Sequence, residues 1–76
     1  MNKNRRTYLE GVIRALNFSM EQITGARDEE QEYLDNMPEN LLESERASRA
    51  EEAISGMDYA LDYLEDAISS LEDAIQ

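Results

Sequence analysis

Residues 51–76 read EEAISGM DYALDYL EDAISSL EDAIQ, a seven-residue unit that occurs three times and is then cut short. Each unit begins with an acidic residue and has Ala third and Ile or Leu fourth, and the complete units end in Met or Leu. Apolar residues at this spacing lie along one side of an α-helix, where they pack lengthwise on another helix. The stretch therefore predicts a long helix with a partner helix beside it.

The same spacing continues upstream through Ala50 and Ala47, so we expect this second helix over about residues 44–75. Its seam, meaning the apolar residues that face the partner helix, is predicted to contain Ile54, Met57, Leu61, Leu64, Ile68, Leu71 and Ile75. An alanine recurs beside the seam at residues 53, 60, 67 and 74. This line widens the apolar side to that of a bundle helix.

A first helix is predicted over about residues 5–34. Its seam residues are spaced alternately by four and three, at Leu9, Ile13, Leu16, Met20 and Ile23. Continued in the same phase, the seam meets Arg27 and Glu30. Either the buried side turns there toward Ala26 and Tyr33, or the charged residues are paired.

A chain reversal is predicted over residues 35–43. Pro38 disfavours a helical backbone at the residue before it, and Asn36 stands three residues before Glu39, which is the spacing of a helix-capping box. We expect a short helical segment here, followed by the second helix with Ser44 as a candidate N-cap. The prediction is a single all-α domain, residues 1–76, folded as an antiparallel helical hairpin.

The charge pattern favours the antiparallel arrangement. The chain has a formal net charge of -11, and no Lys or Arg occurs after Arg49. An antiparallel partner would bring the basic residues of segment 3–14 near the acidic end of the second helix. At the other end, Arg46 and Arg49 would reach acidic residues of segment 28–32, and Arg27 would reach segment 51–52.

A chain of 76 residues without Cys or His has a marginal core and lacks the disulfides or zinc that stabilise many small domains. We therefore expect a homodimer in which two hairpins form a four-helix bundle.

Several function classes are disfavoured by composition. Without His or Cys, the chain lacks ordinary nucleophile and base pairs and common metal motifs, so we expect no enzyme, no cofactor and no metal site. Its excess of carboxylates disfavours direct binding of nucleic acid. The chain contains no apolar run long enough to predict a membrane span, and we expect a cytoplasmic protein.

The acidic side of the second helix is the candidate partner-binding face. We predict that it contains Asp58, Tyr59, Asp62, Tyr63, Glu65, Asp66, Glu72 and Asp73. One interpretation is a recognition surface whose carboxylates steer toward a basic partner while the tyrosines supply contact area. The other is that the carboxylates only keep the protein soluble and the tyrosines fill a dimer interface.

The stretch ARDEEQEYLDNMPENLLESERASRAEEAI, residues 26–54, is followed by acidic Ala-Ile heptads and preceded by MNKNRR. In these features the chain resembles a group of short uncharacterised proteins encoded by Firmicutes and their phages. The resemblance implies a small accessory protein of a phage or mobile element, located in the host cytoplasm, and it assigns no activity or functional residue.

Two functions follow as hypotheses. The first is an inhibitor of the anti-CRISPR or anti-restriction type, whose acidic face imitates nucleic acid and occupies the basic surface of a host protein that binds nucleic acid. The second is a structural, assembly or antitoxin-like coiled-coil module, whose heptads only oligomerise or bind a partner helix.

Overall fold

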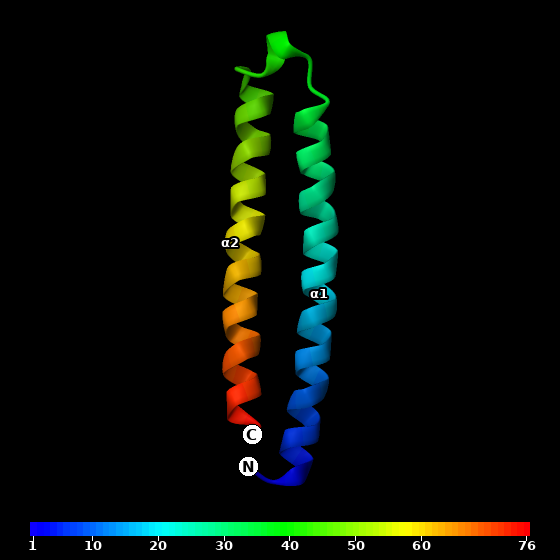
Figure 1. The fold of residues 1–76 in the computed structure, drawn as a ribbon, viewed down its shortest axis with the longest axis vertical. Coiled ribbons are helices and arrows are strands. Elements are labelled where there is room, and N and C mark those ends of the chain that lie inside the picture. Colours follow the sequence, from blue (N-terminus) through cyan, green and yellow to red (C-terminus); the bar gives the residue numbers. More distant parts are fainter.

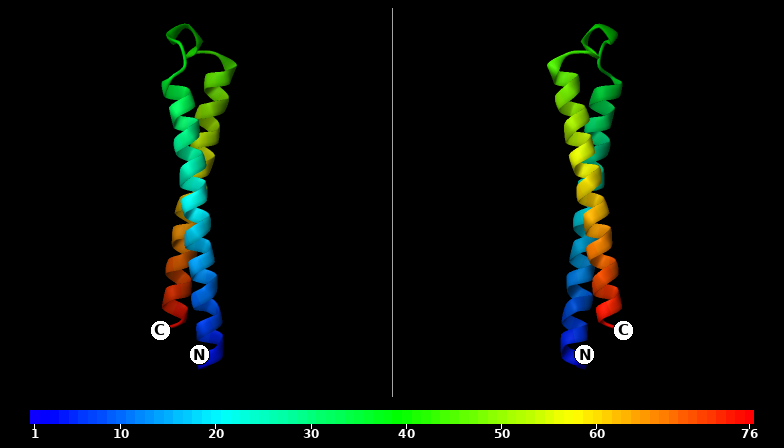
Figure 2. Two further views of the ribbon diagram at one scale, coloured as in Figure 1. Left: turned by 90° about the vertical axis from the view of Figure 1, so that its right-hand side faces the viewer. Right: turned by 90° about the vertical axis from the view of Figure 1, so that its left-hand side faces the viewer.

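The computed structural model describes residues 1–76 and contains two long helices, α1 (Lys3–Asp35) and α2 (Glu45–Ala74), joined through a short 3-10 helix, η1 (Glu39–Leu41). The helices run antiparallel, with the connection at one end and both chain termini at the other (Figure 1). The rod measures 59 × 15 × 12 Å, and α1 and α2 change sides along it, as packed heptad seams require (Figure 2). The predicted all-α helical hairpin is confirmed.

Side chains of the sequence fix where both helices begin. The side-chain oxygen of Asn2 accepts a hydrogen bond from the backbone N–H of Arg5 at 2.7 Å, and Ser44 accepts one from the backbone N–H of Ala47 at 3.4 Å. Each bond satisfies a donor that the first helical turn leaves without a partner. Ser44 is therefore the N-cap of α2, as expected.

Asn36 has a different role from the one its spacing to Glu39 indicated. It ends α1, and its backbone N–H donates to the carbonyl oxygen of Glu32 at 3.0 Å. Pro38 instead precedes η1 and makes no side-chain capping bond. The reason is that α1 continues to Asp35, so Asn36 completes its last turn.

The core is a single seam between the two helices. All twelve predicted seam residues are buried or half-buried, and Ile13, Ile54 and Ile68 are the most enclosed of them. Ala47 and Ala50, which are 1% and 2% exposed, fill the space where α2 begins. Since these five are the only buried residues of 76, the hairpin alone has a small core for its length.

The line of alanines beside the seam is mostly uncovered. Ala53, Ala67 and Ala74 are exposed and Ala60 is half-buried, so α1 does not reach across the widened apolar side of α2. A two-helix contact covers a narrow stripe, because each helix is a cylinder about 10 Å across. The wider apolar side therefore remains open in a single chain.

Candidate functional site

Five of the eight predicted partner-binding residues form a continuous patch of exposed carboxylates on α2. We call this patch the acidic face, and it consists of Asp62, Glu65, Asp66, Glu72 and Asp73. None of its carboxylates lies within 4.0 Å of a basic group, because the three ion pairs of the molecule involve only Arg27 and Arg49 as cations. These negative charges are consequently available to an outside partner.

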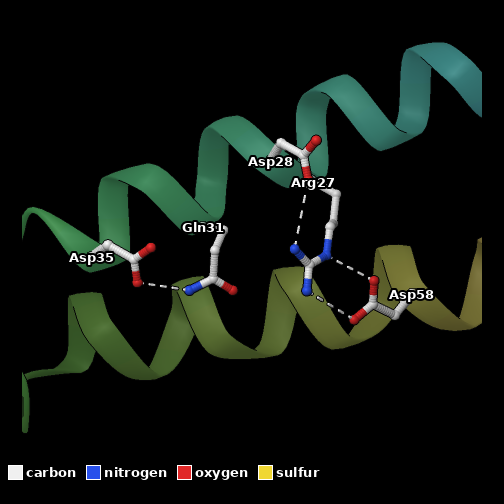
Figure 3. A network of polar contacts seen from close by, with 5 residues as sticks. All are labelled: Arg27, Asp28, Gln31, Asp35 and Asp58. Carbon is white, nitrogen blue, oxygen red and sulfur yellow. Dashed lines mark hydrogen bonds and ion pairs between the residues drawn. The ribbon is translucent and has the colours of Figure 1, made fainter.

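Asp58 does not belong to this patch, contrary to prediction. It lies against α1, where Arg27 donates to both of its carboxylate oxygens, at 2.9 Å from Nε and 3.5 Å from Nη2 (Figure 3). Arg27 also lies 3.6 Å from Asp28. Paired bonds from a guanidinium to a carboxylate fix the geometry of both groups. Asp58 therefore holds the hairpin together and is not free for a partner.

The same pair decides how α1 accommodates charge in its seam. The seam does not turn, since Ala26 and Tyr33 are exposed, and Arg27 instead keeps its place and bonds across to α2. The expected contact of Arg27 with segment 51–52 is wrong, because the observed register brings Asp58 to its level. The hydrogen bond and charge of Asp58 raise the pKa of Arg27, so the guanidinium stays charged at neutral pH and beyond the ordinary arginine range.

The ion pairs expected at the two ends of the hairpin do not form. Arg49 bonds Glu45 one turn earlier in α2, at 2.7 Å, and does not reach α1. The basic residues near the N-terminus lie more than 4.0 Å from every carboxylate, and Arg6 donates to the backbone carbonyl of Met1. Long exposed side chains gain little from such pairs. The basic tip, which comprises Lys3, Arg5 and Arg6, is therefore unpaired.

A groove between the helices adjoins the acidic face. It has a volume of about 420 Å³ and is lined by Asn17, Met20, Glu65, Ile68, Ser69 and Glu72. Met20 and Ile68 come from the seam, whereas Glu65 and Glu72 stand two turns apart on α2. A site with an apolar lining and two carboxylates suits the side chain of Lys or Arg, whose stem is apolar and whose end is charged.

The sequence patterns did not identify Asn17 and Ser69 as parts of this groove. Both are polar and flank the seams, and neither has a distinctive chemical pattern. The signal that would have found them is the pairing register of the two helices. That register becomes visible only once Arg27 is matched with Asp58.

The two predicted tyrosines are exposed and lie one turn apart on the side of α2 that faces away from the seam. Tyr59, which is 64% exposed, shares a helix face with Asp66 and borders a second, shallow groove of about 560 Å³ that also includes Glu51 and Glu52. Tyr63, which is 70% exposed, is turned by about 40° from Tyr59, toward the line of alanines at residues 60 and 67. Tyr63 therefore lies between the acidic face and that line of alanines.

The side of the hairpin opposite the interhelical groove carries no charge over most of its length. Asn17 of α1 and Glu65 of α2 both line the groove, so they lie on the same side of the hairpin. The residues on the opposite side then follow from the helical spacing of α1 and α2. From α1 these are Tyr8, Val12, Ala15, Ser19, Gln22 and Ala26, and from α2 they are Ala53, Gly56, Ala60, Tyr63, Ala67, Ser70 and Ala74. We call this surface the uncharged face.

No three acidic residues of the molecule come together in a geometry that would hold a metal ion. Neither helix combines the length and the apolar composition that crossing a membrane requires. Comparison with protein-family models, curated proteins and solved structures finds no match to this chain.

Proposed function

We propose that this protein acts by binding another protein, as an acidic inhibitor that occupies a basic nucleic-acid-binding surface of a host protein. The observation that carries the proposal is the acidic face, with its unpaired carboxylates, beside the groove edged by Glu65 and Glu72. The resemblance to short proteins of Firmicutes and their phages supports a phage or mobile-element origin and an anti-CRISPR or anti-restriction role.

The spacing of charge on the acidic face supports imitation of a nucleic-acid strand. Its five carboxylates occur between residues 62 and 73. At 1.5 Å per residue this is about one negative charge per 4 Å of helix axis, close to the axial rise of about 3.4 Å per phosphate of one strand in a DNA duplex. A basic channel that accommodates a strand would therefore meet a similar field along this helix.

The groove supplies a specific contact in addition to the general field. An Arg or Lys of the partner would place its stem on Met20 and Ile68 and its cation between Glu65 and Glu72. Tyr59 would add apolar contact area next to the carboxylates. In this arrangement, charge steers the encounter and the groove determines which basic residue is held.

The test is affinity capture from a lysate of the bacterial host, with the tagged protein as bait. We expect a captured nucleic-acid-binding protein that is released by salt and is displaced by competing nucleic acid. Changing Glu65→Gln together with Glu72→Gln is expected to weaken its binding by about tenfold or more. The proposal is wrong if this variant binds the captured protein as tightly as the unchanged chain does.

A matched control removes the same number of charges elsewhere. Glu39→Gln together with Glu43→Gln changes two exposed carboxylates of the connection between the helices, which lie outside the groove and the acidic face. This control variant is expected to bind almost normally. Capture that resists salt and is unaffected by either pair of substitutions would instead support a coiled-coil module whose apolar heptads bind a partner helix.

A further inference from the structure

We propose that a second copy of this chain packs on the uncharged face, so that two hairpins meet through their uncharged faces with their turns at opposite ends. The result is a four-helix bundle whose two acidic faces both point outward. This proposal is independent of what the acidic face binds, and either can fail without the other.

The uncharged face leaves apolar surface open to water. Tyr8 and Tyr63 on this face are 73% and 70% exposed, and Phe18, at its edge, is 59% exposed. The hairpin itself buries few residues, so covering this surface adds apolar burial that the single chain lacks.

The charge of the chain favours another copy as the occupant of this face. Every chain carries a net charge of -11, so two copies repel unless they meet where neither has carboxylates. Docking through the groove side would set Glu65 and Glu72 of one copy against those of the other. The uncharged face avoids this repulsion, and its many Ala, Gly and Ser residues let two helices approach closely, because the distance between packed helices depends on the size of the side chains at the contact.

The available area is sufficient for a specific interface. The uncharged segments of both helices are about 30 Å long at 1.5 Å per residue. With the 15 Å width of the rod, each copy contributes about 500 Å², and the total of about 1,000 Å² reaches the lower bound for specific interfaces.

The charges at the two ends of the rod favour one direction for the second copy. The basic tip of α1 lies at the open end of the hairpin and has no carboxylate within 4.0 Å. The turn end of α1 carries Glu29, Glu30 and Glu32, and Glu30 lies on the same side of the helix as Val12 of the uncharged face. With the turns at opposite ends, the basic tip of each copy lies beside the acidic turn end of the other. With the turns together, the two acidic ends would repel.

The test compares two substitutions that add the same charge on opposite sides of α2. The unchanged chain is expected to sediment at twice its 8.7 kDa mass. Ala67→Glu places two unpaired carboxylates in the proposed interface and is expected to raise the dimer dissociation constant by about 100-fold or more. Ser69→Glu, two residues away on the groove side, is expected to remain a dimer.

Circular dichroism is the control for folding. Loss of the dimer is assigned to the interface only if both variants retain the helical spectrum of the unchanged chain. A monomeric unchanged chain at submillimolar concentration overturns the proposal. So does a pair of variants in which Ser69→Glu dissociates and Ala67→Glu does not.

The direction is tested separately with a spin label at the turn. The chain contains no cysteine, so Asn40→Cys gives one labelling site per copy, on exposed η1. Pulsed electron paramagnetic resonance is expected to show a distance between the two labels comparable to the 59 Å length of the rod. A separation under about 20 Å, the width of two helices, would mean that the turns lie together and would contradict the proposed direction.

Discussion

Arg27 and Asp58 are the residues that determine how α1 and α2 are matched along their lengths. A seam made only of Leu, Ile and Met tolerates a shift by one heptad, because each position would meet another apolar residue. Such a shift would set Asp58 against Met20 or Leu34 in place of Arg27, so that Asp58 would lose both hydrogen bonds, whereas Arg27 would meet Glu51 or Glu65. The pair therefore favours the observed register through Asp58, and setting register is the best-attested role of a polar group in a helical seam.

Breaking this pair should destabilise the hairpin, whereas removing an unpaired carboxylate should not. Asp58→Asn removes the charged partner that Arg27 has on α2 and leaves it only Asp28, 3.6 Å away on its own helix, so we expect the melting temperature to fall by a few degrees. Asp62→Asn removes the same charge from the acidic face. We expect it to leave the melting temperature unchanged or slightly higher, since repulsion among the carboxylates of the acidic face decreases. Thermal melts followed by circular dichroism compare the two. Equal melting temperatures would show that the pair does not stabilise the fold.

At the scale of the elements, the start of α2 depends on one hydroxyl. Ser44 accepts from the backbone N–H of Ala47, and its own hydroxyl donates to the carbonyl of Leu41 at 2.5 Å. One side chain thereby joins η1 to the first turn of α2. Serine is favoured at this position because its short side chain reaches the free backbone donors.

Removing this cap should cost measurable stability. Ser44→Ala is expected to reduce the free energy of unfolding by about 1 kcal/mol, which lowers the melting temperature by about 4–8 °C in a domain of this size. Ser48→Ala, at an exposed position one turn into α2, is the control and is expected to be neutral or slightly stabilising, because alanine favours helix. A Ser44→Ala variant that melts with the unchanged chain would show that the cap is dispensable.

The elements were predictable from sequence because their signals are local and repeated. The heptads identify every seam residue, and Pro38 marks the connection between the helices. The partner of Arg27 was not predictable in the same way, since it depends on how far α2 is shifted along α1. The observed partner, Asp58, lies several residues beyond the expected segment 51–52. The end-to-end ion pairs failed for another reason: exposed charged side chains lose entropy when paired and gain little energy in water.

As a whole, the molecule is a rod with two unlike long sides. The acidic face and the interhelical groove lie on one side, and the uncharged face lies on the other. Heptad positions of each helix predict such a division only after the antiparallel register is known, because that register decides which flanks of α1 and α2 share a side. The carboxylates were therefore visible in the sequence, whereas their association with Asn17 and Met20 in one groove required the structure.

The excess of negative charge should make the stability of the whole rod depend on salt. The acidic face concentrates five unpaired carboxylates on one helix, and their mutual repulsion is weakened when salt shortens the screening length. Added sodium chloride is therefore expected to raise the melting temperature, by about 4–8 °C for each kcal/mol of repulsion removed. The rise should be smaller in the Glu65→Gln, Glu72→Gln variant, which separates charge screening from a general effect of salt. If the melting temperature of the unchanged chain falls with salt, attraction between paired charges such as Arg27 and Asp58 outweighs repulsion along the acidic face.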